Sequence, residues 1–281
     1  MTLTIYDGKG SEVARFSSEP KPDTYLPANA PSYWFAPEAA LPKTAGVNRF
    51  VWNLRYPPPP SLPYGYYGKL LEYTEYTLAD HAVPSLTPRV QPRGPLVLPG
   101  TYTIELHAGG QTLHQPLTVE LDPRVHISPA DLSDQLDVTQ RIGRGMKASS
   151  DAFYQVAALR KALAERTDAM KQSASKATKD AAADFEKKLD AIDNGTKLAP
   201  GFGPVNRDLS RLIFSAEAAD MRPTDTVQSA AQQSCDALDR DFANWRQLNE
   251  KDIAAFNAIL AANKQGPLPT VAGTGSMGCK P

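Results

Sequence analysis

The chain has 281 residues, of which 41% are hydrophobic and 22% charged, and its 30 basic residues nearly balance its 31 acidic ones, giving a formal net charge of −1. This length predicts about two domains, each able to bury a core. The balanced charge offers no field that would attract nucleic acid or an anionic membrane, so neither is expected as a partner. No apolar run is long enough to cross a membrane, and the first ten residues, MTLTIYDGKG, lack the features of a signal peptide.

Proline marks a change of composition along the chain. Most of the 25 prolines fall between residues 20 and 99, whereas the C-terminal half is rich in alanine, aspartate, lysine and glutamine. Near residue 125 the spacing of hydrophobic residues also changes from every second position to about every 3.6 positions. We therefore expect a β-rich domain over residues 1–125, a helical domain over 126–265 and a disordered tail over 266–281.

The stretch LTIYDGKGSEVARFS, residues 3–17, predicts a β-hairpin. Leu3 and Ile5 alternate with polar residues, and DGKGS between the arms supplies two glycines that can adopt positive φ. Repeated prolines then interrupt residues 18–45, which excludes a continuous helix or a central strand there.

Residues 46–60, GVNRFVWNLRYPPPP, begin like a strand and end in prolines. Phe50, Trp52 and Leu54 recur at every second position, which predicts a strand over 47–56 with one apolar face. Pro57–Pro60 then end the strand, because proline has no N–H to donate to a ladder and adjacent prolines favour polyproline II. A proline-rich docking peptide is the second interpretation, and it requires these prolines to be exposed.

A long connection rich in tyrosine and proline follows, over residues 61–99. A loop of this length is unusual unless it is functional or well packed. Its tyrosines could form aromatic platforms for a sugar, with Glu72 and Glu75 beside them as an acid and a base. Alternatively they cover the rim of the sheet domain, which we favour. They are the only ligand or interface candidates that we assign: Tyr64, Tyr66, Tyr67, Tyr73 and Tyr76.

Residues 99–123, PGTYTIELHAGGQTLHQPLTVELDP, carry the clearest local signal. Tyr102, Ile104 and Leu106 alternate, AGGQ offers a hairpin turn, and Leu117 and Val119 alternate again. Several strands joined by turns, with no helix between them, are typical of an antiparallel β-sandwich of immunoglobulin-like size.

Helical signals begin at SPADL, where Ser128 is a typical N-cap and Pro129 suits the first turn. Gly143 and Gly145 weaken this first helix near its middle. Further helices are expected over about 168–193, 206–219 and 222–263. Their apolar stripes predict an antiparallel α-helical bundle, so the fold class is α+β, an immunoglobulin-like sandwich followed by a bundle.

Few residues suggest chemistry. His107 and His114 lie on the two arms of one predicted hairpin and can approach each other, but no third ligand is near, so we expect no metal site. The chain has no GxSxG motif, no P-loop and no GxGxxG at a strand–helix junction, and its carboxylates are best explained as solvated surface. We therefore assign no catalytic, cofactor-binding or metal-binding residue and expect no cofactor.

The two cysteines give little information about redox state. Cys235 lies in a helical pattern, and Cys279 lies in the glycine-rich tail GTGSMGCKP. Nothing in their spacing supports a disulfide between them, although the sequence leaves one open. A free, buried and apolar Cys235 is the favoured interpretation.

Three segments taken in order resemble a known family. GVNRFVWNLRYPPP (46–59), GPLVLPGTYTIEL (94–106) and QPLTVELDPRV (115–125) are similar to the C-terminal region of bacterial proteins built on sortilin-like, BNR (Asp-box) β-propellers, which are often described as sialidase-like glycosyl hydrolases. The hairpin at 3–18 and FNAILAANKQGPLP (256–269) also resemble that region. In that family an immunoglobulin-like sandwich and a helical region follow the propellers.

The resemblance implies an accessory role outside the catalytic part. The Asp-box repeat SxDxGxTW that marks the propeller does not occur here, so no catalytic residue of the family is carried over, and Met1 falls where the sandwich would begin, as in a fragment or a split gene. We expect a non-catalytic module, periplasmic or secreted, whose partner is the β-propeller of the same or an adjacent polypeptide. The alternatives are a glycan hydrolase in its own right and a protein- or peptide-binding module.

Overall fold

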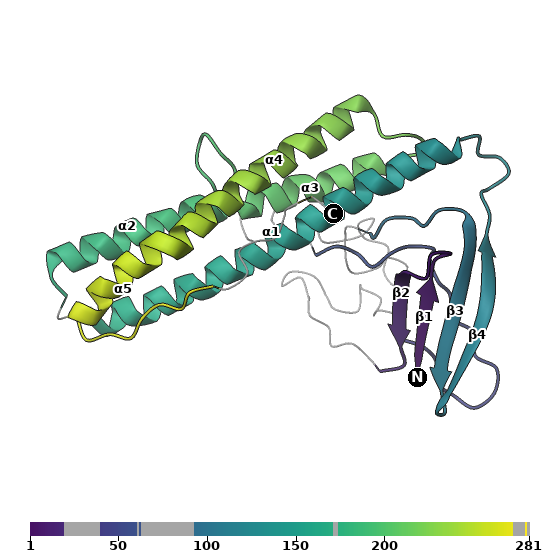
Figure 1. Cartoon of the computed structure of the whole chain (residues 1–281), viewed down its shortest axis with the longest axis horizontal. Coiled ribbons are helices and arrows are strands. Elements are labelled where there is room, and N and C mark those ends of the chain that lie inside the picture. Colours follow the sequence, from purple (N-terminus) through teal and green to yellow (C-terminus); the bar gives the residue numbers. More distant parts are fainter. Residues whose placement is uncertain (20–39, 61, 63–92, 171–173, 272–278, 280–281) are drawn as a thin grey trace, which may run out of the picture. The chain divides into compact units, whose positions relative to one another are not determined.

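The computed structural model describes residues 1–19, 40–60, 62, 93–170, 174–271 and 279. It is an α+β structure with an antiparallel sheet at the N-terminus, followed by helices (Figure 1). The chain forms two compact units. We call Met1–Gln140 with Ile213–Val227 the sheet unit, and Arg141–Leu212 with Gln228–Pro281 the helical unit.

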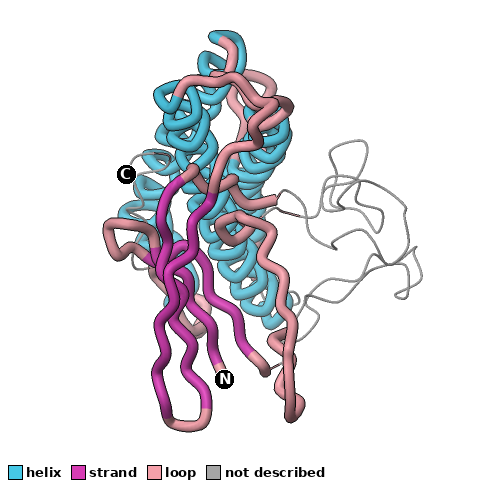
Figure 2. The backbone as a smooth tube through the Cα atoms, turned by 90° about the vertical axis from the view of Figure 1, so that its right-hand side faces the viewer, coloured by secondary structure: helices cyan, strands magenta, loops and turns pink. Residues whose placement is uncertain are grey.

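One four-stranded antiparallel sheet organises the sheet unit (Figure 2), and its strands lie in the order β2-β1-β3-β4 (Figure 1). Both predicted hairpins are confirmed, one formed by β1 and β2 and the other by β3 and β4. Gly109 and Gly110 have φ of 57° and 76°, as the tight turn between β3 and β4 requires. The strands are β1 (Thr2–Tyr6), β2 (Glu12–Ser17), β3 (Gly100–Ala108) and β4 (Gln111–Val119).

One face of this sheet is apolar, as the alternation in the sequence predicts. Ile5, Val13 and Tyr102 are buried in a single cluster, and Ile104 and Leu117 pack against it half-buried. Among the described residues these four strands form the only sheet. The second sheet of a sandwich therefore stays a prediction.

The strand predicted over residues 47–56 is wrong. In this stretch only Arg55 forms a bridge, with Leu96, and Leu54 has a φ of 57°, which breaks the extended path. The predicted apolar face is partly correct, because Phe50 lies 4.7 Å from Phe16 and Trp52 lies 5.8 Å from Tyr102, measured between ring centroids. Aromatic anchoring thus holds this segment to the sheet unit without a ladder of backbone hydrogen bonds.

The helices begin close to where capping signals place them. The Ser128 hydroxyl accepts a hydrogen bond from Asp131 N at 3.1 Å, and Ser175 caps α2 in the same way through Thr178 N. The predicted helix at 168–193 starts late, because α1 continues to Met170. The helices are α1 (Pro129–Met170), α2 (Lys176–Asp193), α3 (Phe202–Ala216), α4 (Asp225–Gln247), the π-helix η2 (Leu248–Asp252) and α5 (Ile253–Ala262).

An apolar core fills the helical unit. Phe185 of α2 stacks on Phe256 of α5, and Phe202 of α3 packs on Phe242 of α4, each pair with ring centroids 5.0 Å apart. Most of the predicted apolar stripe of the last helical region is buried. These buried residues are Ala231, Leu238, Phe242, Trp245, Ile253, Phe256 and Leu260.

Part of the tail predicted to be disordered is packed. Leu268 is buried, and its N–H donates a hydrogen bond of 2.7 Å to the side chain of Asn257. Cys279 is also buried. No helix in the described part of the chain is long and apolar enough to cross a membrane.

Candidate functional site

The predicted ligand residues lie outside the described part of the chain. This applies to the five tyrosines, Tyr64, Tyr66, Tyr67, Tyr73 and Tyr76, and to the carboxylates Glu72 and Glu75. Their role as a sugar platform or as a cover for the sheet therefore stays a prediction. The structure instead brings together charged residues that the sequence did not single out.

A nearly buried ion pair joins distant parts of the sheet unit. Arg55 Nη1 lies 2.5 Å from Glu217 Oε2 and also donates a hydrogen bond of 2.6 Å to the carbonyl of Gly94. Glu217 Oε1 accepts a 2.8 Å hydrogen bond from the N–H of Leu96. The Arg55 and Glu217 side chains are only 14% and 11% exposed. Both charges are thus hydrogen-bonded, as buried ions need to be.

Backbone hydrogen bonds on both sides of Arg55 hold its segment in place. The Tyr56 N–H donates to Pro95 O, and the Val97 N–H donates to Leu54 O, each at 2.9 Å, so the bridge at Arg55 is flanked on both sides. A Cβ on Gly94 would lie 1.8 Å from Tyr56 O, which explains why glycine stands there.

Gln135 supports the backbone on either side of Glu217. Its Nε2 donates to the carbonyls of Ala216 and Ala219, at 2.9 and 2.8 Å, and so satisfies acceptors in the turn that follows α3. Glu217 lies within this turn, so its carboxylate is presented from a fixed backbone.

A small cavity opens beside the ion pair. It has a volume of about 120 Å³ and is lined by Arg55, Arg93, Ile213, Phe214 and Glu217. The described part of the lining combines two guanidinium groups with one carboxylate and an apolar wall. Such a lining can hold a small anion, because arginine presents planar donors that match an oxyanion.

Nothing local in the sequence marked this site. Arg55 and Glu217 are 162 residues apart, and neither belongs to a motif. The only available signal was the position of Arg55 at the end of a strand-like stretch, just before the prolines. Their proximity is a consequence of tertiary structure.

A second polar cluster covers the face of the β3–β4 hairpin. His107 Nε2 lies 2.8 Å from Glu105 Oε1, and His114 Nδ1 lies 3.7 Å from Glu105 Oε2. The Tyr6 hydroxyl donates to the same carboxylate at 3.3 Å. The hydrogen bond from His107 is the main cause that lowers the pKa of Glu105. The two histidines thus meet at a shared carboxylate.

This histidine cluster does not have the geometry of a metal centre. Within the residues that the structure describes, no group of three or more His, Cys, Asp or Glu side chains is placed to hold a metal ion. His107 and His114 are both about half exposed. The cluster is therefore best described as a hydrogen-bonded surface network.

Two buried carboxylates lie in the helical unit. Burial is the main cause that raises the pKa of both Asp193 and Asp241 to about 7. Arg160 lies 3.2 Å from Asp193 and partly opposes this shift. A raised pKa of a buried carboxylate makes the stability of the folded chain depend on pH.

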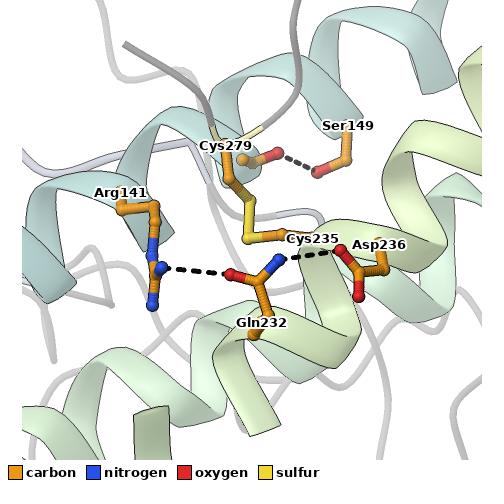
Figure 3. Close-up of a disulfide and its surroundings, with 7 residues drawn as sticks. Arg141, Ser149, Gln232, Cys235, Asp236 and Cys279 are labelled. Carbon is orange, nitrogen blue, oxygen red and sulfur yellow. Dashed lines mark hydrogen bonds between the residues drawn. A yellow bond between two sulfur atoms is a disulfide. The ribbon is translucent and has the colours of Figure 1, made fainter. Parts of the chain in front are cut away.

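A disulfide closes the helical unit, contrary to the favoured interpretation of Cys235 as a free thiol. Cys235 of α4 is bonded to Cys279, which lies 44 residues further along the chain (Figure 3). Cys279 lies against α1 at Gly145, where a Cβ would lie 2.6 Å from Cys279 Sγ and 2.9 Å from Leu209 Cδ1. Gly145, which was expected only to weaken α1, thus makes room for the bond.

Hydrogen-bonded polar side chains lie beside this disulfide. Arg141 donates to Gln232 at 3.2 Å, and Gln232 donates to Asp236 at 2.7 Å (Figure 3). Cys235 and Cys279 are both buried. Reductants reach such a bond slowly, so its features are those of a structural disulfide.

Comparisons with known proteins add no assignment: no protein-family model, no curated protein and no solved structure matches this chain.

Proposed function

We propose that this chain is a non-catalytic accessory module of an exported, BNR-repeat, sialidase-like glycosyl hydrolase-type protein. In this proposal an immunoglobulin-like sandwich, built on the observed sheet, packs against a β-propeller of the same or an adjacent polypeptide. The helices form an antiparallel bundle that supports the sandwich. The proposal combines the family resemblance with the chemistry of the described residues.

The observation that supports an exported location is the disulfide between Cys235 and Cys279. Disulfides persist in the periplasm and outside the cell, whereas cytosolic reductants keep most thiols reduced. A bond that ties a C-terminal segment to α4 suits a protein that works in an oxidising compartment. It supports a periplasmic or secreted location.

The charged groups favour a structural role over catalysis. Arg55 and Glu217 are engaged with each other and with the backbone of Gly94 and Leu96. Glu105 is shared between histidines on an open surface. Catalysis by an acid and a base needs such groups free to exchange protons with a substrate in a cleft.

The test measures hydrolysis by the purified chain with its disulfide intact. We expect no release of reducing sugar from a panel of polysaccharides above the level of a heat-denatured sample. Hydrolysis that is abolished by Glu72→Gln or Glu75→Gln would overturn the proposal and establish the alternative, a glycan hydrolase in its own right. A reading frame with Asp-box repeats directly upstream would supply the propeller for a direct binding assay.

Protein or peptide binding is the second candidate, and one observation favours it. Val47 is fully exposed and Val51 is 69% exposed, on a segment whose opposite side packs against the sheet unit. Exposed apolar side chains on a surface segment are typical of a site that binds a protein partner. If this function is correct, Val51→Asp should abolish capture of a peptide partner, while Asn53→Asp should leave it intact.

A further inference from the structure

The cavity beside Arg55 has a lining suited to one class of ligand. Its described lining residues include two arginines, Arg55 and Arg93, and one carboxylate, Glu217. Both oxygens of the one carboxylate are engaged, because Glu217 Oε1 accepts from Leu96 and Glu217 Oε2 pairs with Arg55. Within the described lining, the guanidinium of Arg55 is therefore a group with which an anionic ligand can pair.

Arg55 has hydrogen-bonding capacity left over. A guanidinium carries five N–H donors, and the hydrogen bonds of Arg55 within the described residues, to Gly94 and Glu217, all come from Nη1. Its Nε and Nη2 make no hydrogen bond to another described residue. These two nitrogens form the edge of the guanidinium that binds a carboxylate through two parallel hydrogen bonds.

The remaining lining limits the size and the character of the ligand. Ile213 and Phe214 form an apolar wall, and Phe214 is 45% exposed. A volume of about 120 Å³ holds only a small molecule. A ligand with one carboxylate and one compact apolar group matches both parts of the lining.

We infer that this cavity binds a small carboxylate, with Arg55 Nε and Nη2 donating to its two oxygens and Ile213 and Phe214 contacting its apolar part. Arg93 also lines the cavity. Glu217 acts as a positioning residue, because it orients the Arg55 guanidinium through Nη1. This inference does not depend on the accessory role proposed above.

Benzoate is a suitable probe, and benzamide, which has nearly the same shape without the charge, is its matched control. Isothermal titration of the intact, oxidised chain should show saturable binding of benzoate in the millimolar range. Benzamide should bind at least about tenfold more weakly, since a charge-assisted hydrogen bond contributes roughly 1.5 kcal/mol or more. Equal affinity for the two probes, or no saturable binding of benzoate, would overturn the inference.

Variants test whether the binding is at this cavity. Arg55→Lys keeps the positive charge beside Glu217 but loses the two parallel donors, Nε and Nη2. Benzoate affinity should therefore fall about tenfold. Phe214→Ala changes an exposed ring and should also weaken binding while the melting temperature stays near that of the wild type. Arg124→Met is the control, because it removes one positive charge from the same unit at an exposed position outside the cavity.

Three further results would contradict the inference. An equal loss of affinity in Arg124→Met would mean that benzoate responds to overall charge. Tighter binding of inorganic phosphate than of benzoate, measured by competition, would mean that the site selects a different anion. Retained benzoate affinity in both Arg55→Lys and Phe214→Ala, with both variants folded, would place the binding elsewhere.

Discussion

Single residues of the helical unit make its stability depend on pH. Asp241 is 3% exposed, and its Oδ2 has no hydrogen-bond partner among the described residues. Burial raises its pKa to about 7, well above the ordinary value of 3.8. The folded state therefore binds a proton that the unfolded chain releases between these two values. The stability that this proton provides is present below the unfolded pKa and is lost as pH rises through the folded pKa.

Replacing Asp241 with asparagine should remove this pH dependence. Compared with the wild type, Asp241→Asn should gain roughly 2 to 3 kcal/mol of unfolding free energy between about pH 5 and about pH 8, since each pKa unit corresponds to about 1.4 kcal/mol. Urea unfolding at the two pH values measures the difference. Asp236→Asn, at an exposed position on the same helix, should show no such gain. A pH-independent effect of Asp241→Asn would contradict the raised pKa.

At the scale of elements, the segment 47–56 shows how aromatic packing replaces strand pairing. Trp52 lies edge-on to Tyr102, and its Nε1 donates a hydrogen bond of 3.1 Å to the carbonyl of Arg55. These contacts fix the backbone that carries Arg55 toward Glu217. The segment keeps the alternation of a strand but pairs only at Arg55, because Leu54 turns the chain out of the extended region.

Truncating the two sides of this segment should have different effects. Trp52→Ala should cost about 2 to 4 kcal/mol of stability, because it removes a half-buried ring and its hydrogen bond. Val51→Ala, its exposed neighbour, should change stability by less than about 0.5 kcal/mol. Denaturant midpoints of the two variants, compared with the wild type, measure both effects. Similar losses for the two would mean that the segment faces the other way.

At the scale of the whole molecule, the disulfide between Cys235 and Cys279 links two distant parts of the chain covalently. It closes a loop of 44 residues between α4 and the C-terminal segment. By the loop-entropy relation such a closure stabilises the folded state by about 4 kcal/mol, mainly by restricting the unfolded chain. Arginine contacts hold the same segment, since Arg166 donates hydrogen bonds to the carbonyls of Gly266 and Pro267.

Removing the disulfide should lower stability without changing the fold. The double variant Cys235→Ser with Cys279→Ser should lose roughly 2 to 4 kcal/mol, measured by thermal unfolding with the circular dichroism spectrum of the folded state retained. A reductant should lower the melting temperature of the wild type but not of the double variant, which serves as the control. A melting temperature unaffected by either change would mean that Cys235 and Cys279 are not bonded in solution.

Sequence alone determined the features that depend on neighbouring residues. The hairpins at β1–β2 and β3–β4 were predictable because alternation and glycine turns act within a few positions. Ser128 marked the start of α1 for the same reason, since capping involves only the adjacent turn. The family resemblance, and the accessory function drawn from it, rest on sequence and stay a proposal.

Only the tertiary structure decided the features that need two distant segments. Whether residues 47–56 form a strand depends on a neighbouring strand, which periodicity does not reveal. The pairing of Arg55 with Glu217, and of Cys235 with Cys279, joins positions whose approach no local preference encodes. The role of Gly145 was likewise not predictable from local sequence. Its lack of a side chain matters because Cys279 packs against it, and this contact exists only in the folded chain. Burial and close approach are properties of the folded chain, and the candidate site is built from them.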